Sequence, residues 1–263
     1  MVIHDVIAYL EKKYLPALAA DFDAERIGLS IGDGQLPLKK ILLALDLTID
    51  VASEALAKDV NLIITHHPFI FDPLYKIQFA TPKGKVIKHL CQHDISLYVM
   101  HTNLDAAEGG MNDVLATRLG LRDIRPAGDV IFKESYMRIG DTDSQPLSVF
   151  TSLVRERFGS RAVKVAGRPE KMIRKVGIVG GAGASADIIG QAITLGLDCF
   201  ITGEIKLHIA QYAHSYDLAL IEVEHGIEKL FLPELKAKME KDLLLAGRVF
   251  VSKIKTDPFF YDF

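Results

Sequence analysis

Along most of the chain, short apolar runs alternate with segments in which apolar residues recur at helical spacing. In about residues 1–124 the apolar runs are KILLALDLT, NLIITHH and ISLYVMHTNLD, and the helical patterns that follow them are IDVASEALA, GKVIKHLCQH and MNDVLATRLG. A further helical pattern, MVIHDVIAYLEKKYL, begins the chain. Strands that alternate with helices predict a mostly parallel sheet covered on both faces, which is a three-layer α/β unit.

The pattern changes after RDIRPAGD, where Pro126 and Gly128 interrupt it. A strand within VIFKESYMRIG, a helix from about Pro146 to Phe158 and two strands, RAVKVA and KVGIVGG, predict a second unit of α+β type. Alternation then resumes with GASADIIGQAITLG, DCFITGE, IKLHIAQYAHS and LALIEVEH, and a long helix is expected from about Ile227 to Leu244, before the strand RVFVSK. The aromatic end DPFFYDF is expected to dock on a domain or a subunit.

The composition is that of an ordinary globular protein and excludes several other classes. With 263 residues, 49% hydrophobic and 25% charged, the chain matches ordinary globular proteins and excludes small disulfide-stapled folds. The net charge of −3, with no long basic block, argues against nucleic acid or an anionic membrane as partner. Neither a transmembrane helix nor a signal peptide is expected. Cys91 and Cys199 both lie in apolar runs, which predicts two buried thiols in a reducing compartment and a cytoplasmic protein.

Histidines and acids gather where the predicted strands end, which is where α/β sheets usually place their functional sites. His66 and His67 end the run LIIT, and Pro68 stops that strand. Because neighbours on a regular strand face opposite sides, this pair is suited to two adjacent ions rather than to one. A second strand ends in His101 and is followed by Asp105, which could equally be a turn or cap residue.

A third strand, LALIEVEH, ends at His225, and Glu228 follows three residues later. If a helix has begun there, His225 and Glu228 share one face. The set of five candidate ligands is His66, His67, Asp105, His225 and Glu228. Imidazole and carboxylate together suit Zn, Fe or Mn, and a bridging carboxylate can hold two divalent ions. The mixture argues against a closed structural zinc site, which usually contains thiolates.

Two further features have competing interpretations. Glu204 and His208 lie four residues apart at the start of a predicted helix, as either a solvated helical pair or a proton-transfer pair that faces the metals. The run VGIVGGAGASADIIG partly matches a dinucleotide fingerprint at Gly181 and Gly183, which would indicate a nicotinamide-dependent oxidoreductase. Close approach of a loop to another backbone or to a ligand explains the same glycines.

Several of these motifs, in this order, resemble the family of NGG-one-interacting-factor-three-like proteins, whose members are often named GTP cyclohydrolase I type 2 homologues. The motifs are ITHHPFIF, HTNLDAAEGGMNDVLA, the GGAGAS turn and CFITGEIKLHIAQYA, and the resemblance runs from about Ile27 to Glu228. It implies an α/β protein of two domains, each of two or three layers, with the first domain made from both chain ends. The expected ranges are 1–125 with 226–263 for the metal-binding domain and 126–225 for the second domain.

The resemblance also implies a hexameric ring with a dinuclear metal centre in each subunit, at the carboxyl ends of the strands in the cleft between the domains. The family's ligands fall on the five residues selected above. One departure concerns the last motif, because the family has Gly before the late His and an acid four residues after it. In this chain Glu224 precedes His225, and Glu228 follows after three residues.

The leading hypothesis is a hydrolase in which two divalent ions, roughly 3.5–4 Å apart, share Glu228 and activate a water for attack on a nucleotide-like ring or a phosphoester. His101, and Glu204 with His208, are the candidates for moving the proton. The cyclohydrolase reaction, which opens the purine ring of GTP by adding water, is implied by resemblance alone. The rival hypothesis is a metal-binding scaffold or regulatory protein without turnover.

Overall fold

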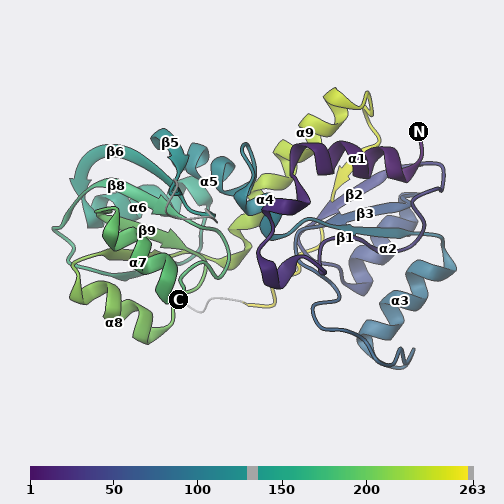
Figure 1. The fold of residues 1–263 in the computed structure, drawn as a ribbon, viewed down its shortest axis with the longest axis horizontal. Coiled ribbons are helices and arrows are strands. Elements are labelled where there is room, and N and C mark those ends of the chain that lie inside the picture. Colours follow the sequence, from purple (N-terminus) through teal and green to yellow (C-terminus); the bar gives the residue numbers. More distant parts are fainter. Residues whose placement is uncertain (129–135, 260–263) are drawn as a thin grey trace. The chain divides into compact units, whose positions relative to one another are not determined.

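The computed structural model describes residues 1–128 and 136–259, which divide into two compact units. The first unit contains both ends of the chain, Met1–Ala107 and Leu232–Pro258. The second contains the described part of Glu108–Phe231 together with Phe259. Each unit has its own sheet, and helices lie against the sheets (Figure 1).

The sheet of the first unit has the strand order β1-β4-β3-β2-β11. The strands are β1 Gly28–Ile31, β2 Ile41–Ala44, β3 Leu62–Thr65, β4 Ser96–Val99 and β11 Val249–Val251. All neighbours are parallel except β1, which pairs antiparallel with β4 at the edge. Strands β2, β3 and β4 are buried along their whole length, as expected of parallel strands covered on both faces.

Helices cover this sheet on two sides, so the unit has three layers (Figure 1). The helices and 3-10 turns are α1 Ile3–Lys13, η1 Pro16–Leu18, η2 Asp21–Asp23, α2 Ile49–Ala57, α3 Pro82–Gln92, α4 Thr102–Ala106 and α9 Leu232–Asp242. Apolar residues of α2 and α3, including Val51, Ala55 and Leu90, form one core cluster with the sheet. Helices α1 and α9 lie on the other side (Figure 1), where Leu10 and Met239 are fully buried.

The sheet of the second unit has the order β5-β6-β8-β9-β10-β7. The strands are β5 Arg122–Pro126, β6 Arg138–Pro146, β7 Lys164–Ala166, β8 Met172–Ile178, β9 Cys199–Thr202 and β10 Ala219–Glu222. Strands β8, β9 and β10 are parallel, whereas β5, β6 and β7 pair antiparallel. The helices are α5 Met111–Leu119, α6 Leu147–Phe158, α7 Ala186–Thr194, α8 Leu207–Ser215 and the 3-10 helix η3 His225–Phe231.

Two pairs of helices enclose this second sheet. Helices α7 and α8 contribute Ile189 and Ala213 to one core cluster with Phe200 of the sheet. Helix α6 packs on β6 and β8 and buries Phe150, and α5 packs on α6, β5, β6 and β8. The α/β prediction with two layered units is therefore confirmed.

The unit boundaries differ from the expected ones at 125/126 and 225/226, because they lie at Ala107/Glu108 and Phe231/Leu232. Helix α5 continues the strand and helix alternation of the first unit along the sequence, yet it packs on the second sheet. The stretch expected to be a break contains β5, an antiparallel edge strand that ends at Pro126. An edge position tolerates a proline, which has no N–H to donate.

Most of the expected helices and strands are present, and the helix expected from about Ile227 to Leu244 is the main error. The chain forms η3 over His225–Phe231, and the α-helix begins only at Leu232. Pro233 explains the difference, because proline lacks an N–H and is tolerated in the first turn of an α-helix but not in its interior. Parts of the expected VIFKESYMRIG strand and of the DPFFYDF end lie outside the described residues.

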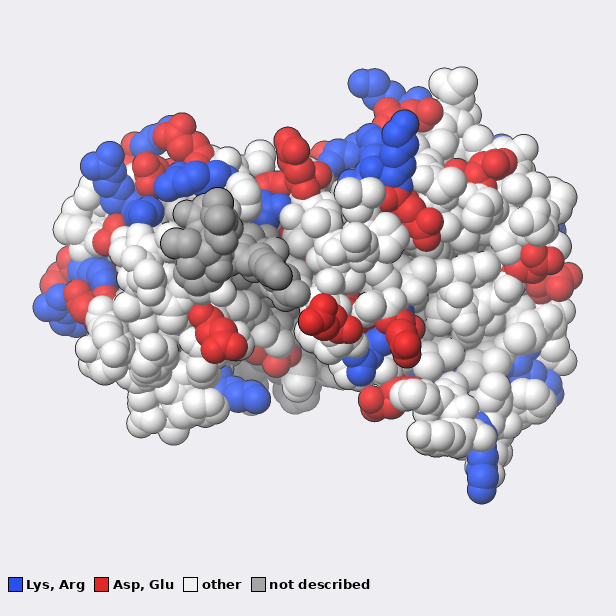
Figure 2. Space-filling view, viewed as in Figure 1, with Lys and Arg blue, Asp and Glu red and all other residues white. Residues whose placement is uncertain are grey.

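On the face drawn in Figure 2, Lys and Arg side chains are interspersed with Asp and Glu. Ion pairs between exposed side chains include Lys39–Asp59, and a less exposed pair is Lys13–Asp242. Among the described residues, no helix combines the length and the apolar character that crossing a membrane requires.

The expectation that both cysteines are buried is wrong for one of them. Cys199 lies on β9 and is fully buried, whereas Cys91 is exposed on α3. The apolar run around Cys91 is real, but the core side of α3 is formed by Val86, Ile87 and Leu90. Burial raises the pKa of the Cys199 thiol, which keeps it protonated and unreactive.

We expect a thiol reagent such as DTNB to modify one cysteine per native chain and two per unfolded chain. The Cys91→Ser variant should lose the native reaction and keep the single reaction after unfolding. Rapid modification of that variant in its native state, measured by absorbance, would contradict the burial of Cys199.

Candidate metal centre

In the first unit, the expected site residues lie just beyond the carboxyl ends of neighbouring parallel strands. His66 and His67 follow β3, and His101 and Asp105 follow β4. Because β3 and β4 are parallel and adjacent, these ends meet at one edge of the sheet. One ring nitrogen from each of His66, His67 and His101 lies within 4.8 Å of the others. The fold thus brings three histidines together, close enough to hold a metal ion.

The placement of His66 and His67 differs from the expectation that they occupy a regular strand. Strand β3 ends at Thr65, and both histidines lie in the bend that follows it. The backbone N–H of His67 donates to the carbonyl of Leu45 at 3.0 Å, and the Thr65 hydroxyl donates to the carbonyl of His67 at 3.0 Å. The alternation of strand faces does not apply in a bend, and the two ring centroids are only 5.0 Å apart.

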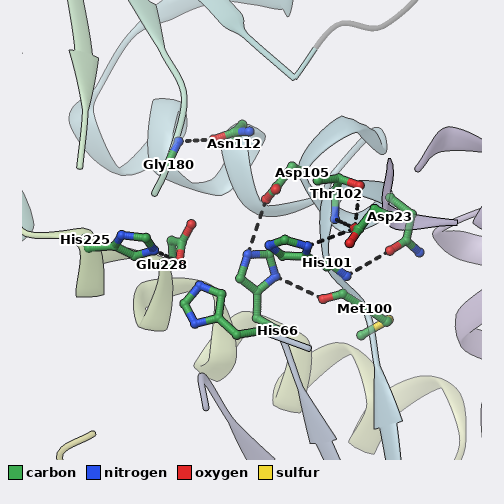
Figure 3. A network of polar contacts seen from close by, with 12 residues as sticks. Asp23, His66, Met100, His101, Thr102, Asp105, Asn112, Gly180, His225 and Glu228 are labelled. Carbon is green, nitrogen blue, oxygen red and sulfur yellow. Dashed lines mark hydrogen bonds and ion pairs between the residues drawn. The ribbon is translucent and has the colours of Figure 1, made fainter. Parts of the chain in front are cut away.

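In all three rings Nδ1 is held by an oxygen of the surrounding structure. His66 pairs with the Met100 carbonyl at 3.0 Å and His101 with Asp23 Oδ2 at 2.9 Å (Figure 3). His67 pairs with Asp46 Oδ1 at 2.6 Å. A carbonyl or an ionised carboxylate can only accept, so Nδ1 must be the donor. The other nitrogen, Nε2, then carries the lone pair of the neutral ring. Metal-binding histidines commonly have this arrangement.

Asp23 and Asp46 are the residues that sequence reasoning missed. Asp23 is fully buried and also accepts from the backbone N–H and the hydroxyl of Thr102, at 3.1 Å and 2.7 Å. Burial raises the pKa of Asp23, but hydrogen bonds from His101 and Thr102 outweigh it and leave the pKa below its ordinary value. Asp46 accepts in addition from the hydroxyl of Thr256.

Asp105 adds a carboxylate to the three histidines. Its Oδ1 lies 3.7 Å from Nε2 of His66, and both side chains are largely buried (Figure 3). This separation is too long for a hydrogen bond. Two ligands at about 2.1 Å from one ion in tetrahedral geometry lie about 3.4 Å apart, so the observed spacing is close to that of two ligands of one ion.

The second unit also places its candidate residues beyond the carboxyl ends of parallel strands. Glu204 follows β9, and His225 with Glu228 follows β10. His225 and Glu228 lie in η3, and in a 3-10 helix residues three apart lie directly above one another. Nε2 of His225 is therefore only 3.4 Å from Oε2 of Glu228 (Figure 3). The 3-10 conformation is what makes a three-residue spacing suitable for two ligands.

Glu204 has a different partner from the expected one. Nδ1 of His225 donates to Glu204 Oε1 at 2.6 Å, which gives His225 the same arrangement as the three histidines of the first unit. The predicted helical pairing of Glu204 with His208 is wrong, because α8 begins only at Leu207. His208 lies on α8 with an exposed side chain and is not brought to this group.

Glu224, which stands where the resembled family has glycine, is largely buried and anchors the start of η3. Its Oε1 accepts from the backbone N–H of Arg161 at 2.7 Å and from the Arg161 guanidinium at 3.3 Å. The carbonyl of Glu224 accepts from Ile227 at 3.1 Å. The acid at this position therefore supports the 3-10 turn rather than adding a ligand.

The donor set of each unit fits a divalent ion. The first unit has three imidazoles and the carboxylate of Asp105, and the second has one imidazole and the carboxylate of Glu228. Each imidazole is oriented through Nδ1. Such a mixture suits Zn, Fe or Mn. Neither cysteine belongs to either group, which is unlike a closed structural zinc site.

Comparison with known proteins relates the chain to one family. Residues 1–258 match the family model described as Duf34/NIF3 (NGG1p interacting factor 3). A Lactococcus lactis protein named "GTP cyclohydrolase 1 type 2 homolog" is 32% identical, with 99% of each chain covered. A Staphylococcus aureus hypothetical protein of known structure has a TM-score of 0.90 at 29% identity, with 100% and 99% coverage. A Bacillus cereus protein related to NIF3 shares the fold at a TM-score of 0.91 and 24% identity, with 100% and 99% coverage.

We expect the neutral imidazoles of His66, His67, His101 and His225 to be protonated at Nδ1 in metal-free protein, because each Nδ1 donates to an oxygen that can only accept. Nitrogen-15 NMR of labelled protein at about pH 9, where ordinary histidines are neutral, measures this directly. In Asp46→Ala, only the His67 signals should shift towards the other tautomer. Protonation at Nε2 in the unsubstituted protein would contradict the arrangement.

Proposed function

The chain belongs to the Duf34/NIF3 family, and on that premise we propose that it is a hydrolase dependent on two divalent metal ions. The observation that carries the proposal is the repeated geometry of its histidines. Four imidazoles are oriented through Nδ1, and carboxylates lie near Nε2 of His66 and of His225. Each of these rings has its proton fixed on Nδ1, which leaves Nε2 of the neutral ring as the atom that can bind a metal ion.

The proposed ligands are His66, His67 and Asp105 from the first unit and His225 and Glu228 from the second. A single centre that uses both groups of ligands is part of this proposal and follows from the family resemblance. Asp105 lies two residues before the unit boundary at Ala107, and Glu228 lies three residues before the boundary at Phe231. At both boundaries, therefore, a proposed ligand is within three residues of the point where the chain passes from one unit to the other.

When bound, two divalent ions would supply an activated water and would stabilise negative charge that develops on the substrate. The chain's own residues orient the ligands and handle protons. Asp46 and Glu204 hold the rings of His67 and His225. His101, held by the buried carboxylate of Asp23, is the proposed proton carrier. Because Nδ1 of His101 donates to Asp23, Nε2 is the ring atom that would take up and return a proton.

The proposed substrate is a small molecule with a nucleotide-like ring or a phosphoester. The names of the curated relatives, GTP cyclohydrolase 1 type 2 homolog, make GTP the first candidate to test. We further propose a cytoplasmic homo-oligomer, a hexameric ring by family resemblance. Both cysteines are free thiols, as is usual in a reducing compartment.

A second candidate is a metal-binding scaffold or regulatory protein without turnover. The family description, NGG1p interacting factor 3, names an interaction rather than a reaction and favours this alternative. The two candidates differ in one measurable respect: the scaffold predicts no hydrolysis above that of free metal for any substrate.

Chelator-stripped protein should lose hydrolysis of its substrate and recover it with Zn²⁺, Mn²⁺ or Fe²⁺, in a screen that begins with GTP and includes phosphoesters. His67→Ala should lower kcat/KM by roughly 100-fold or more, because a proposed ligand is removed. His93→Ala, at an exposed position on the end of α3, is the matched control and should keep wild-type activity. Full activity of the stripped protein, or of His67→Ala, would refute the metal-dependent mechanism.

His101→Gln should separate proton transfer from metal binding. We expect about two ions per chain, as in the wild type, with kcat lowered by roughly 100- to 10,000-fold. Loss of an ion, measured by elemental analysis, would instead assign His101 as a ligand.

A further inference from the structure

A buried hydrogen bond joins α5 to the turn that follows β8. Asn112, in the first turn of α5, is fully buried, and its Oδ1 accepts from the backbone N–H of Gly180 at 2.8 Å (Figure 3). The two residues are 68 positions apart in the chain. A buried backbone N–H needs an acceptor, and β8 has already ended at Ile178, so Asn112 supplies it.

The same turn is held from the opposite side by the end of β9. The hydroxyl of Thr202 donates to the carbonyl of Gly181 at 3.0 Å and accepts from the N–H of Gly183 at 3.0 Å. The N–H of Gly203 also donates to the carbonyl of Gly181, at 2.8 Å. The backbone of the turn is thus fixed by both α5 and β9.

This fixed backbone forms a wall against the two proposed ligands of the second unit. A Cβ on Gly181 would lie 2.4 Å from Oε1 of Glu228 and 3.3 Å from Nε2 of His225. A Cβ on Gly180 would lie 3.2 Å from Cγ of Glu228. Gly181 also has a backbone φ of +58°, which residues with a side chain rarely adopt. Gly180 and Gly181, which have no side chain, therefore allow the close approach of Glu228.

The carboxylate of Glu228 has little freedom to move away from this wall. Glu228 is 3% exposed, and the 3-10 helix η3, which contains it, packs against α5. A shift of the turn would therefore change the 3.4 Å separation between Oε2 of Glu228 and Nε2 of His225. That separation decides whether both atoms can reach one ion.

We propose that Asn112 is a positioning residue for metal binding, which acts through the Gly180–Gly181 turn to set the carboxylate of Glu228 against His225. The proposal rests on the proposed function, since it concerns the ions bound there. Asn112 acts through its hydrogen bond to Gly180, so its effect passes through the backbone of the turn.

Two substitutions test the proposal, one at Asn112 and one in the Gly180–Gly181 turn. Asn112→Ala removes the acceptor, and Gly181→Ala places a methyl group where the Glu228 carboxylate lies. The control for the first is Asn61→Ala, because Asn61 is also buried and accepts from a backbone N–H, that of Lys39, at 2.8 Å. The control for the second is Gly159→Ala, because Gly159 has a similar φ of +64° and a Cβ added there would meet none of the described atoms within 4 Å.

The probe is Co²⁺, titrated into chelator-stripped full-length protein and followed by its d–d absorption, which reports coordination geometry. We expect Asn112→Ala and Gly181→Ala to weaken Co²⁺ binding by about 10- to 100-fold and to change the absorption spectrum. Asn61→Ala and Gly159→Ala should lower the melting temperature of the metal-free protein but keep the wild-type dissociation constant and spectrum.

Wild-type affinity and spectrum in both Asn112→Ala and Gly181→Ala would overturn the positioning role and leave the proposed function standing. Equal weakening in the two control variants would also overturn it, because the effect would then follow from lost stability. A wild-type chain that binds no Co²⁺ would overturn the proposed function together with this inference.

Discussion

The proposed metal centre depends on one kind of hydrogen bond, which recurs at four histidines: Nδ1 of the ring donates to an oxygen of the surrounding structure. An imidazole has two nitrogens, and fixing the proton on one places the lone pair on the other in a defined direction. The acceptors come from different sources, namely the Met100 carbonyl and the carboxylates of Asp23, Asp46 and Glu204. Although the acceptors differ in kind, each of them fixes the proton of its ring on Nδ1.

The two sheets position these histidines and carboxylates in the same way. In each unit, parallel strands end at one edge, and the polar residues lie in the bends and turns just beyond it. Local backbone conformation then refines the positions. The bend after Thr65 turns His66 and His67 to the same side, and the 3-10 geometry of η3 aligns His225 with Glu228. A regular strand or α-helix at either place would give a different set of neighbours.

Most of the helices and strands could be predicted from the sequence, because hydrophobic periodicity reports which face of a segment is buried. Sequence reasoning selected His66, Asp105 and His225 because polar residues at strand ends are visible in the sequence. It missed Asp23, which lies 78 residues from His101 and follows no predicted strand. It also misplaced α5 and Cys91, because the packing of a helix depends on tertiary contacts that the order of elements does not specify. Pro233 marks the start of α9 in the sequence, because proline is tolerated in the first turn of a helix but not in its interior.

Anomalous diffraction from crystals of the metal-loaded protein, recorded at the absorption edge of the bound metal, tests the central claim most directly. For the proposed centre we expect two anomalous peaks roughly 3.5–4 Å apart, with His66, His67, Asp105, His225 and Glu228 as the protein ligands. Ions bound elsewhere, or ligands drawn from one unit alone, would contradict it.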